Sequence, residues 1–166
     1  AERVTVVNAD ALQWLEDSRE YFDFIVIDFP DPANFALGKL YTSAFYRLLE
    51  KRLSARGLIA IQSTSPLYAR QSFWCVVTTL EAAGFKTAPY HALVPSFGEW
   101  GYIIAGRQEF VPAAVDLPKT RFLTAETLPL LFSFPADMAR VPAEVNRLNN
   151  QVLVRYFEQE WRKVIR

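Results

Sequence analysis

The sequence has little of what metal sites, cross-links and membrane spans require. Its 166 residues include one cysteine, Cys75, and one histidine, His91. A single cysteine forms no internal disulfide, and a zinc site usually needs three or four nitrogen or sulfur ligands. No apolar run approaches the roughly 20 residues that cross a bilayer, and the first residues lack the pattern of a signal peptide. We therefore expect a soluble, cytoplasmic chain without a metal, in which Cys75 and His91 fill core and surface positions.

The chain also has no excess of charge of either sign. Eighteen Lys and Arg residues balance eighteen Asp and Glu residues, so the formal net charge is zero. Without a broad positive potential, nucleic acid and anionic lipid are not expected partners. Apolar residues are abundant, at 51% hydrophobic and 14% aromatic, which excludes intrinsic disorder. A length near the roughly 150 residues of an ordinary domain predicts a single domain.

The first 106 residues alternate between short apolar runs and segments with helical spacing. Continuous apolar runs are typical of parallel strands that helices cover on both faces. The last two runs are separated by only the loop 95–99, which favours an antiparallel pair at one sheet edge. We predict a doubly wound α/β fold with a mostly parallel sheet, an antiparallel edge pair and helices on both faces. The predicted strands are residues 4–8, 22–27, 58–61, 87–94 and 100–105, and the predicted helices are 12–21, 43–53 and 73–83.

The remainder, residues 107–166, belongs to the same domain but does not continue the alternation of strand and helix patterns. Five prolines interrupt it, so we expect it to wrap the surface as far as Pro142. From Pro142 onward, apolar residues recur at mostly helical intervals and predict a terminal amphipathic helix with cations near its end, where the helix dipole favours them. The apolar positions are Val145, Leu148, Val152, Tyr156 and Trp161, and the basic ones are Arg162, Lys163 and Arg166.

Polar side chains stand where the predicted strands end. Asp10, Asp28, Asp31 and Gln62 lie at or just past the carboxyl ends of three strands. In an open parallel sheet, ligands bind in the crevice beyond those ends. Three carboxylates there would attract a cation, and a carboxylate beside an amine can accept its proton.

Simpler roles compete with this interpretation. Magnesium also suits carboxylate ligands. An aspartate after a strand is commonly a helix cap, which we favour for Asp10 taken alone. For Asp28, Asp31 and Gln62 the residues leave a functional and a structural role open. Phe97 would ordinarily be a packing residue.

A set of short motifs resembles one family. Residues 23–32, Asp-Phe-Ile-Val-Ile-Asp-Phe-Pro-Asp-Pro, are similar to the pattern D-V-I-I-x-D-S-S-D-P of the polyamine synthases, that is, spermidine synthase and its aminopropyltransferase relatives. Four further segments resemble family patterns in the same order, over about residues 2 to 137. They are Leu40-Tyr41 with Phe45-Tyr46, residues 57–62, residues 95–102, and residues 121–127 with Phe134-Pro135.

The resemblance implies a reaction and a set of roles. An aminopropyl group would pass from decarboxylated S-adenosylmethionine to an amine acceptor, a small polyamine. Asp28 would deprotonate or orient the attacking amine, and Asp31 would bind a positively charged nitrogen of the acceptor. Gln62 would help to hold the acceptor, and Phe97 occupies a substrate-binding position of the family.

The resemblance also implies where the nucleoside lies. Asp10 with Ala11 would meet the adenine of decarboxylated S-adenosylmethionine, and Leu40 would pack near the same ring. No metal is implied. The fold implied is a partial Rossmann-like sheet of the methyltransferase type, formed by residues 1–106.

Some positions depart from the family pattern. Phe29 and Pro30 replace its two serines, and Phe97 replaces a tyrosine whose hydroxyl could bond the amine or the aspartate. The identity of the acceptor amine is therefore open. These changes and the terminal helix look more like a bacterial branch in which a membrane-spanning region precedes the synthase domain.

The glycine-rich turn of a complete Rossmann-like transferase is absent. None of the six glycines forms G-x-G-x-x-G, and no strand precedes residues 4–8. We infer a carboxyl-terminal fragment of a longer chain, which by itself lacks activity. Its exposed sheet edge would favour association, most simply as a homodimer. Two alternatives stay open: another S-adenosylmethionine-dependent transferase, such as a methyltransferase, and a non-catalytic polyamine-sensing or assembly domain.

Overall fold

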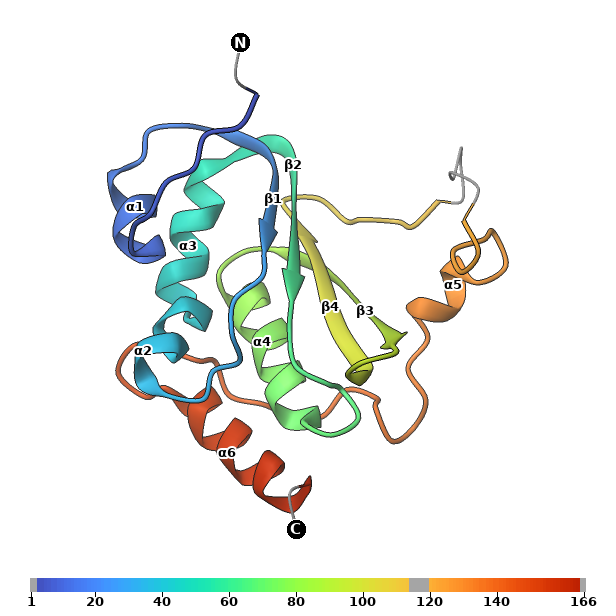
Figure 1. Ribbon diagram of the computed structural model, residues 1–166. Coiled ribbons are helices and arrows are strands. Elements are labelled where there is room, and N and C mark those ends of the chain that lie inside the picture. The colour runs from blue at the N-terminus through green and yellow to red at the C-terminus, as the bar shows by residue number, and fades with distance from the viewer. Residues whose placement is uncertain (1–2, 114–119, 165–166) are drawn as a thin grey trace.

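A mixed four-stranded sheet forms the centre of the molecule. The computed structural model describes residues 3–113 and 120–164. The strand order is β1-β2-β4-β3, with β1 (Phe22–Ile27) parallel to β2 (Leu53–Gln62) (Figure 1). β4 (Gly98–Gly106) runs antiparallel to both β2 and β3 (Lys86–Val94). The prediction of an α/β fold with an antiparallel edge pair is confirmed.

The predicted first strand is wrong. Residues 4–8 form no strand, and Val4 and Val6 are 74% and 80% exposed. A strand is stable only when its backbone N–H and C=O groups have hydrogen-bond partners. In the described residues β1 is an edge strand of the sheet, and residues 4–8 do not pair with it. The predicted parallel part of the sheet is therefore reduced to the single pair β1–β2.

Three helices gather on one side of the sheet in Figure 1. They are α1 (Ala11–Asp17), α3 (Ser43–Arg52) and α4 (Arg70–Ala82). The sheet residues that belong to the buried core are Ile27, Leu53, Ile59, Ile61, Ile103 and Ala105.

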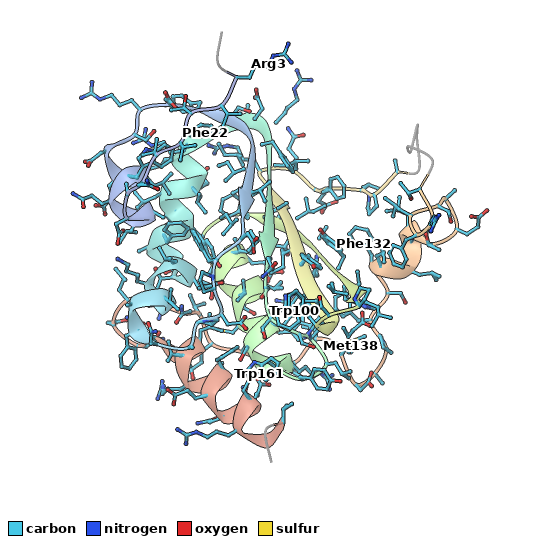
Figure 2. The ribbon with its side chains drawn as sticks, viewed as in Figure 1. Arg3, Phe22, Trp100, Phe132, Met138 and Trp161 are labelled. Atoms are coloured by element: carbon cyan, nitrogen blue, oxygen red, sulfur yellow. The ribbon has the colours of Figure 1, made fainter. Side chains whose placement is uncertain are left out.

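The opposite face of the sheet is much more open. The short helix α5 (Leu128–Leu131) lies near β3, and Phe132 directly follows it (Figure 2). The ring centroid of Phe132 is 5.4 Å from that of Tyr90 in β3. Phe24 and Val26 of β1 are 59% and 67% exposed. Within the described residues, the predicted helix layer on this second face is reduced to α5.

The terminal helix begins later than predicted. α6 (Val152–Val164) packs against α4, whereas Val145 and Leu148 lie in irregular chain. The buried Asn146 makes hydrogen bonds to distant segments in place of helical ones. Arg166 lies outside the described residues. No helix among the described residues is long and apolar enough to span a membrane.

Candidate functional site

The register of the sheet brings three polar residues to neighbouring positions. Ile27 pairs with Ile61, so Asp28 and Gln62 are the next positions along β1 and β2. Gln62 in turn pairs with Tyr102 of β4. Since side chains alternate along a strand, Asp28 follows Phe24 and Val26 on the open face. Burial and the nearby negative charge of Asp28 raise the pKa of Tyr102.

Asp31 lies in the loop that follows β1. It is half-buried, and burial raises the pKa of its carboxyl group. Within the part of the chain that the structure describes, neither Asp28 nor Asp31 forms an ion pair. Asp28 and the loop that follows β1 therefore carry two carboxylates that no described cation pairs with.

The loop that carries Asp31 is held by hydrogen bonding to Tyr41, which lies in the short helix η1 (Lys39–Tyr41). The single proton of the Tyr41 hydroxyl is shared in a bifurcated hydrogen bond between the carbonyl oxygens of Phe29 (3.2 Å) and Pro30 (3.0 Å). Burial, followed by the charges of Asp31 and Asp28, raises the pKa of Tyr41. The structure thus places Asp28, Asp31 and Gln62 at one end of the sheet.

The three residues expected near the nucleoside form a second group. Asp10 caps α1, with Oδ1 accepting from the backbone N–H of Leu12 (3.0 Å) and Gln13 (3.3 Å). Its Oδ2 is 2.6 Å from Lys39 Nζ, and this bond is the main reason that the pKa of Asp10 is lowered. The pair brings Asp10 and the adjacent Ala11 next to the helix that carries Leu40. Asp10 thus has the helix-capping role that the sequence suggested, through Oδ1, while Oδ2 binds Lys39.

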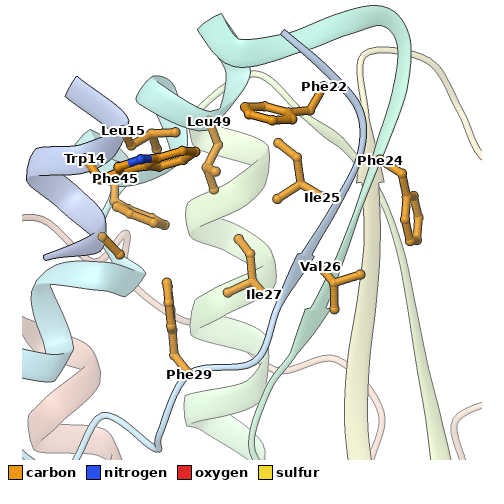
Figure 3. A pocket seen from close by; sticks show the side chains of 11 residues that line it. Trp14, Leu15, Phe22, Phe24, Ile25, Val26, Ile27, Phe29, Phe45 and Leu49 are labelled. Carbon is orange, nitrogen blue, oxygen red and sulfur yellow. The ribbon is translucent and has the colours of Figure 1, made fainter. Parts of the chain in front are cut away.

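An apolar cavity of about 280 Å³ runs along the edge of β1 that no strand of the described residues covers (Figure 3). Ala11 from the nucleoside group and Phe29 from the Asp28–Asp31 loop both line it, so it lies between the two groups. Asp28, Asp31 and Gln62 are not among its lining residues. The full lining is Ala11, Trp14, Leu15, Phe22, Phe24, Ile25, Val26, Ile27, Phe29, Phe45 and Leu49.

Phe97 occupies the turn between β3 and β4. Its side chain is 63% exposed, and its ring centroid is 5.5 Å from that of Trp100. The turn extends beyond the Gln62–Tyr102 pair at the same end of the sheet, because Gly98 begins β4 there. Phe97 is thus an exposed aromatic side chain at the rim of the site.

Sequence reasoning missed three contributors: Tyr41, Tyr102 and Lys39. Tyr41 belongs to a motif that was recognised, but spacing alone does not show which carbonyl oxygens its hydroxyl meets. Tyr102 also belongs to a recognised segment, residues 95–102, but only the pairing of β2 with β4 places it beside Gln62. Among the described residues, no cluster of three or more His, Cys, Asp or Glu side chains is arranged to hold a metal ion.

Comparisons with known proteins agree with these motifs. The spermine/spermidine synthase domain family matches residues 1–116. The chain is 57% identical to polyamine aminopropyltransferase 2 of Ralstonia nicotianae over 166 residues, which are 99% of this chain and 32% of the relative. It is 51% identical to the polyamine aminopropyltransferase of Leptospira interrogans over 164 residues, 98% of this chain and 33% of that one. The chain therefore spans about a third of the length of these curated relatives.

Solved structures show the same fold. A spermidine synthase in complex with the transition state analogue AdoDATO superposes with a TM-score of 0.68 at 24% identity, over 80% of this chain and 48% of that one. Spermidine synthase from Thermotoga maritima gives a TM-score of 0.66 at 23% identity, over 80% of this chain and 47% of that one. At these identities the likeness shows the fold alone.

Proposed function

The chain belongs to the spermine/spermidine synthase domain family, and we propose that it carries the amine-binding half of an aminopropyltransferase active site. The longer protein would move an aminopropyl group from decarboxylated S-adenosylmethionine to a small polyamine. One observation carries the proposal: Asp28 lies near Gln62 and Tyr102, Asp31 follows it in the same loop, and neither carboxylate has an ion-pair partner among the described residues.

The reaction needs an uncharged amine beside a sulfonium. The amine nitrogen forms a bond to the methylene carbon, the carbon–sulfur bond breaks, and its electron pair stays on sulfur as a thioether. An alkylamine with a pKa near 10 is mostly protonated at neutral pH and must lose a proton to attack. Asp28, exposed at the end of β1, takes that proton and orients the nitrogen.

Asp31 and Gln62 hold the other end of the acceptor. A half-buried carboxylate without a described cation is stabilised by a bound ammonium group, so Asp31 is the anchor for the second nitrogen. The Gln62 amide accepts or donates a further hydrogen bond from the neighbouring strand. Phe97 at the rim offers an aromatic face to the methylene groups or to a cationic nitrogen.

The nucleoside of decarboxylated S-adenosylmethionine lies on the side of Asp10, Ala11 and Leu40. Both carboxylate oxygens of Asp10 already accept hydrogen bonds, one from Lys39 and one from the first turn of α1. Its part in nucleoside binding is therefore to position Ala11 and Leu40 around the ring, together with any bond that its exposed carboxylate adds.

The isolated chain lacks the surroundings of a complete site. The edge of β1 is unpaired within the described residues, and Phe24 and Val26 beside it are exposed. The unpaired edge and the exposed apolar side chains support an active site that other parts of the longer protein complete. We therefore expect this chain alone to be inactive. Calorimetric titration with decarboxylated S-adenosylmethionine tests this, because micromolar binding by the isolated chain would contradict it.

The proposal includes location and assembly. The likeness to the bacterial branch supports a cytoplasmic domain joined to a membrane-spanning region in the longer protein, and the open sheet edge supports a homodimer. Fractionation of cells that make the full-length protein tests the first, and analytical ultracentrifugation tests the second. Full-length protein in the soluble fraction would contradict the membrane-spanning region, and a monomer in the ultracentrifuge would contradict the homodimer.

The decisive experiment uses the full-length protein, decarboxylated S-adenosylmethionine and a series of diamines and polyamines, with product mass measured. Asp28→Asn abolishes transfer, and Asp31→Asn raises KM for the amine. Asp23→Asn is the matched control, since Asp23 is an exposed carboxylate in β1, the strand that Asp28 directly follows, and it accepts a hydrogen bond from Ser54 Oγ (2.7 Å). Methyl transfer from S-adenosylmethionine would point to a methyltransferase, and amine binding without transfer to a sensor; either result overturns the proposal.

A further inference from the structure

The loop that carries Asp28 and Asp31 has no regular secondary structure, so something else must hold its shape. Two of its carbonyl oxygens, those of Phe29 and Pro30, accept hydrogen bonds from the Tyr41 hydroxyl. The Phe29 ring packs edge-on against Tyr41, with centroids 6.3 Å apart. These contacts turn Phe29 inward, so that its neighbour Asp28 is left on the exposed side.

Tyr41 is itself held by a residue far along the chain. It is 3% exposed, and its backbone carbonyl accepts a hydrogen bond of 3.0 Å from Asn146 Nδ2. The same Asn146 amide nitrogen donates to the carbonyl of Gly38 at the end of α2 (Phe35–Gly38), at 3.3 Å. Asn146 therefore fixes both ends of η1, the helix that carries Tyr41.

Asn146 is fully buried, and every polar group it has is used. Its backbone N–H donates to Thr79 Oγ1 (2.9 Å) in α4, and its backbone carbonyl accepts from the Ser43 N–H (2.9 Å) in α3. Its Oδ1 accepts from the Leu153 N–H (3.3 Å) in α6. Satisfied buried polar networks of this kind fix one arrangement, because any other leaves groups unpaired at high cost.

We propose that Asn146 and Tyr41 are positioning residues for the candidate site, acting in series: Asn146 fixes η1, and the Tyr41 hydroxyl fixes the carbonyls between Asp28 and Asp31. The inference rests on the proposed function for its catalytic consequence. Asn146 lies beyond residues 1–116, where the family profile matches, so the C-terminal segment takes part in shaping the site.

Tyr41→Phe tests the proposal in the full-length protein, because it removes only the hydroxyl. A misplacement on the order of 1 Å can cost about 100-fold in rate, so we expect kcat to fall about 10- to 100-fold with KM for decarboxylated S-adenosylmethionine unchanged. Tyr46→Phe is the matched control: Tyr46 is equally buried, and its hydroxyl has no hydrogen-bond partner among the described residues. Its kcat stays at the level of the unmodified protein. Equal kcat values for the two variants would overturn the proposal.

Amide hydrogen exchange supplies a readout that does not depend on activity. In Tyr41→Phe the peptide 28–34 exchanges about 10-fold faster, while peptides from α4 are unchanged, because only the local opening of the loop is made easier. Unchanged exchange in the loop would refute the positioning role. A full-length protein without aminopropyl transfer, but with this exchange pattern, would refute the proposed function and leave the positioning role intact.

Asn146→Ala extends the test to the second residue. It removes the donors to Gly38 and Tyr41 and the acceptor of the Leu153 N–H, and it leaves the backbone hydrogen bonds of Asn146 in place. Asn150→Ala is its control, since the Asn150 side chain makes three hydrogen bonds in the same segment, to Arg147, Val145 and Val152. Faster exchange of residues 28–34 only in Asn146→Ala supports a role in which Asn146 acts on the loop through Tyr41. The same change in both variants contradicts that role. Should Asn146→Ala not fold, Tyr41→Phe alone decides.

Discussion

Ser72, near the start of α4, donates both its backbone N–H (3.0 Å) and its hydroxyl (2.6 Å) to one carboxylate oxygen of Glu160 in α6. The other oxygen accepts from the Gln71 N–H at 2.7 Å. The residue at the N-cap position of α4, Ala69, has no side chain that can cap it. A carboxylate from another helix therefore supplies the cap, and joins α6 to the helix that supports β3 and β4.

Glu160→Ala should lower the free energy of unfolding by about 2 kcal/mol. The change leaves two backbone N–H groups and the Ser72 hydroxyl without their acceptor. Urea unfolding followed by circular dichroism measures the loss. Glu158→Ala is the control on the same helix, because Glu158 makes only an exposed pair with Arg162 and should cost less than about 0.5 kcal/mol. Equal losses would contradict the cross-helix cap.

Asp10 should stabilise the fold in a pH-dependent way. Its pKa is lowered, first by the bond from Lys39 and then by the Gln13 N–H. A lowered pKa in the folded state gives stability that is present above the ordinary value of 3.8 and is lost as pH falls through the lowered value. Asp10→Ala should therefore unfold at lower urea concentration than the unmodified protein at about pH 7, with the difference shrinking toward about pH 2.

Asp10→Asn separates the two contributions of this side chain. Asparagine still caps a helix but cannot form the ion pair with Lys39. Its urea midpoint should fall between those of the unmodified protein and Asp10→Ala. A midpoint equal to that of Asp10→Ala would mean that the cap contributes nothing.

Asp31 should show the opposite pH dependence. Burial raises its pKa, so its ionisation costs stability: the folded state is favoured below the unfolded pKa, and that advantage is lost as pH rises through the folded value. Asp31→Asn should then raise the urea midpoint at about pH 7 and leave it unchanged well below the ordinary carboxyl pKa.

The same substitution should weaken amine binding by the full-length protein. A residue whose removal improves stability but harms binding serves function rather than folding. Calorimetry with a diamine measures the affinity. A variant that is both less stable and unaltered in amine binding would show that Asp31 is a structural residue.

Cys75 should resist alkylation in the folded protein. Burial raises the pKa of its thiol to about 12, and the sulfur donates to the Glu144 carbonyl oxygen at 3.2 Å. The thiolate that reacts is thus both rare and shielded. At about pH 8, iodoacetamide should label it at least about 1000-fold more slowly than in urea, as expected when labelling requires unfolding. Prompt labelling of the folded protein would contradict this, and the test is clean because the chain has no other cysteine.

The errors in the sequence-based predictions share one origin. Residues 4–8 have the composition of a strand, but strand formation requires a neighbour, and none is present in the described part of the chain. Residues 142–151 have helical spacing, but Asn146 and Asn150 bond tertiary and turn partners instead, and Gln151 adopts a positive φ of 40°. In both cases a partner outside the local sequence decided the outcome.

Residue types and their spacing determined β1 to β4, α3, α4 and the approximate position of Asp28, Asp31 and Gln62, because apolar runs ended by polar residues report burial and strand ends directly. The tertiary structure alone decided that Tyr41 holds the loop of the two aspartates, that Asn146 holds Tyr41, and that Glu160 caps α4. Those contacts join segments up to 105 positions apart, and a hydrogen bond depends on the geometry of both partners, which no local pattern in the chain encodes.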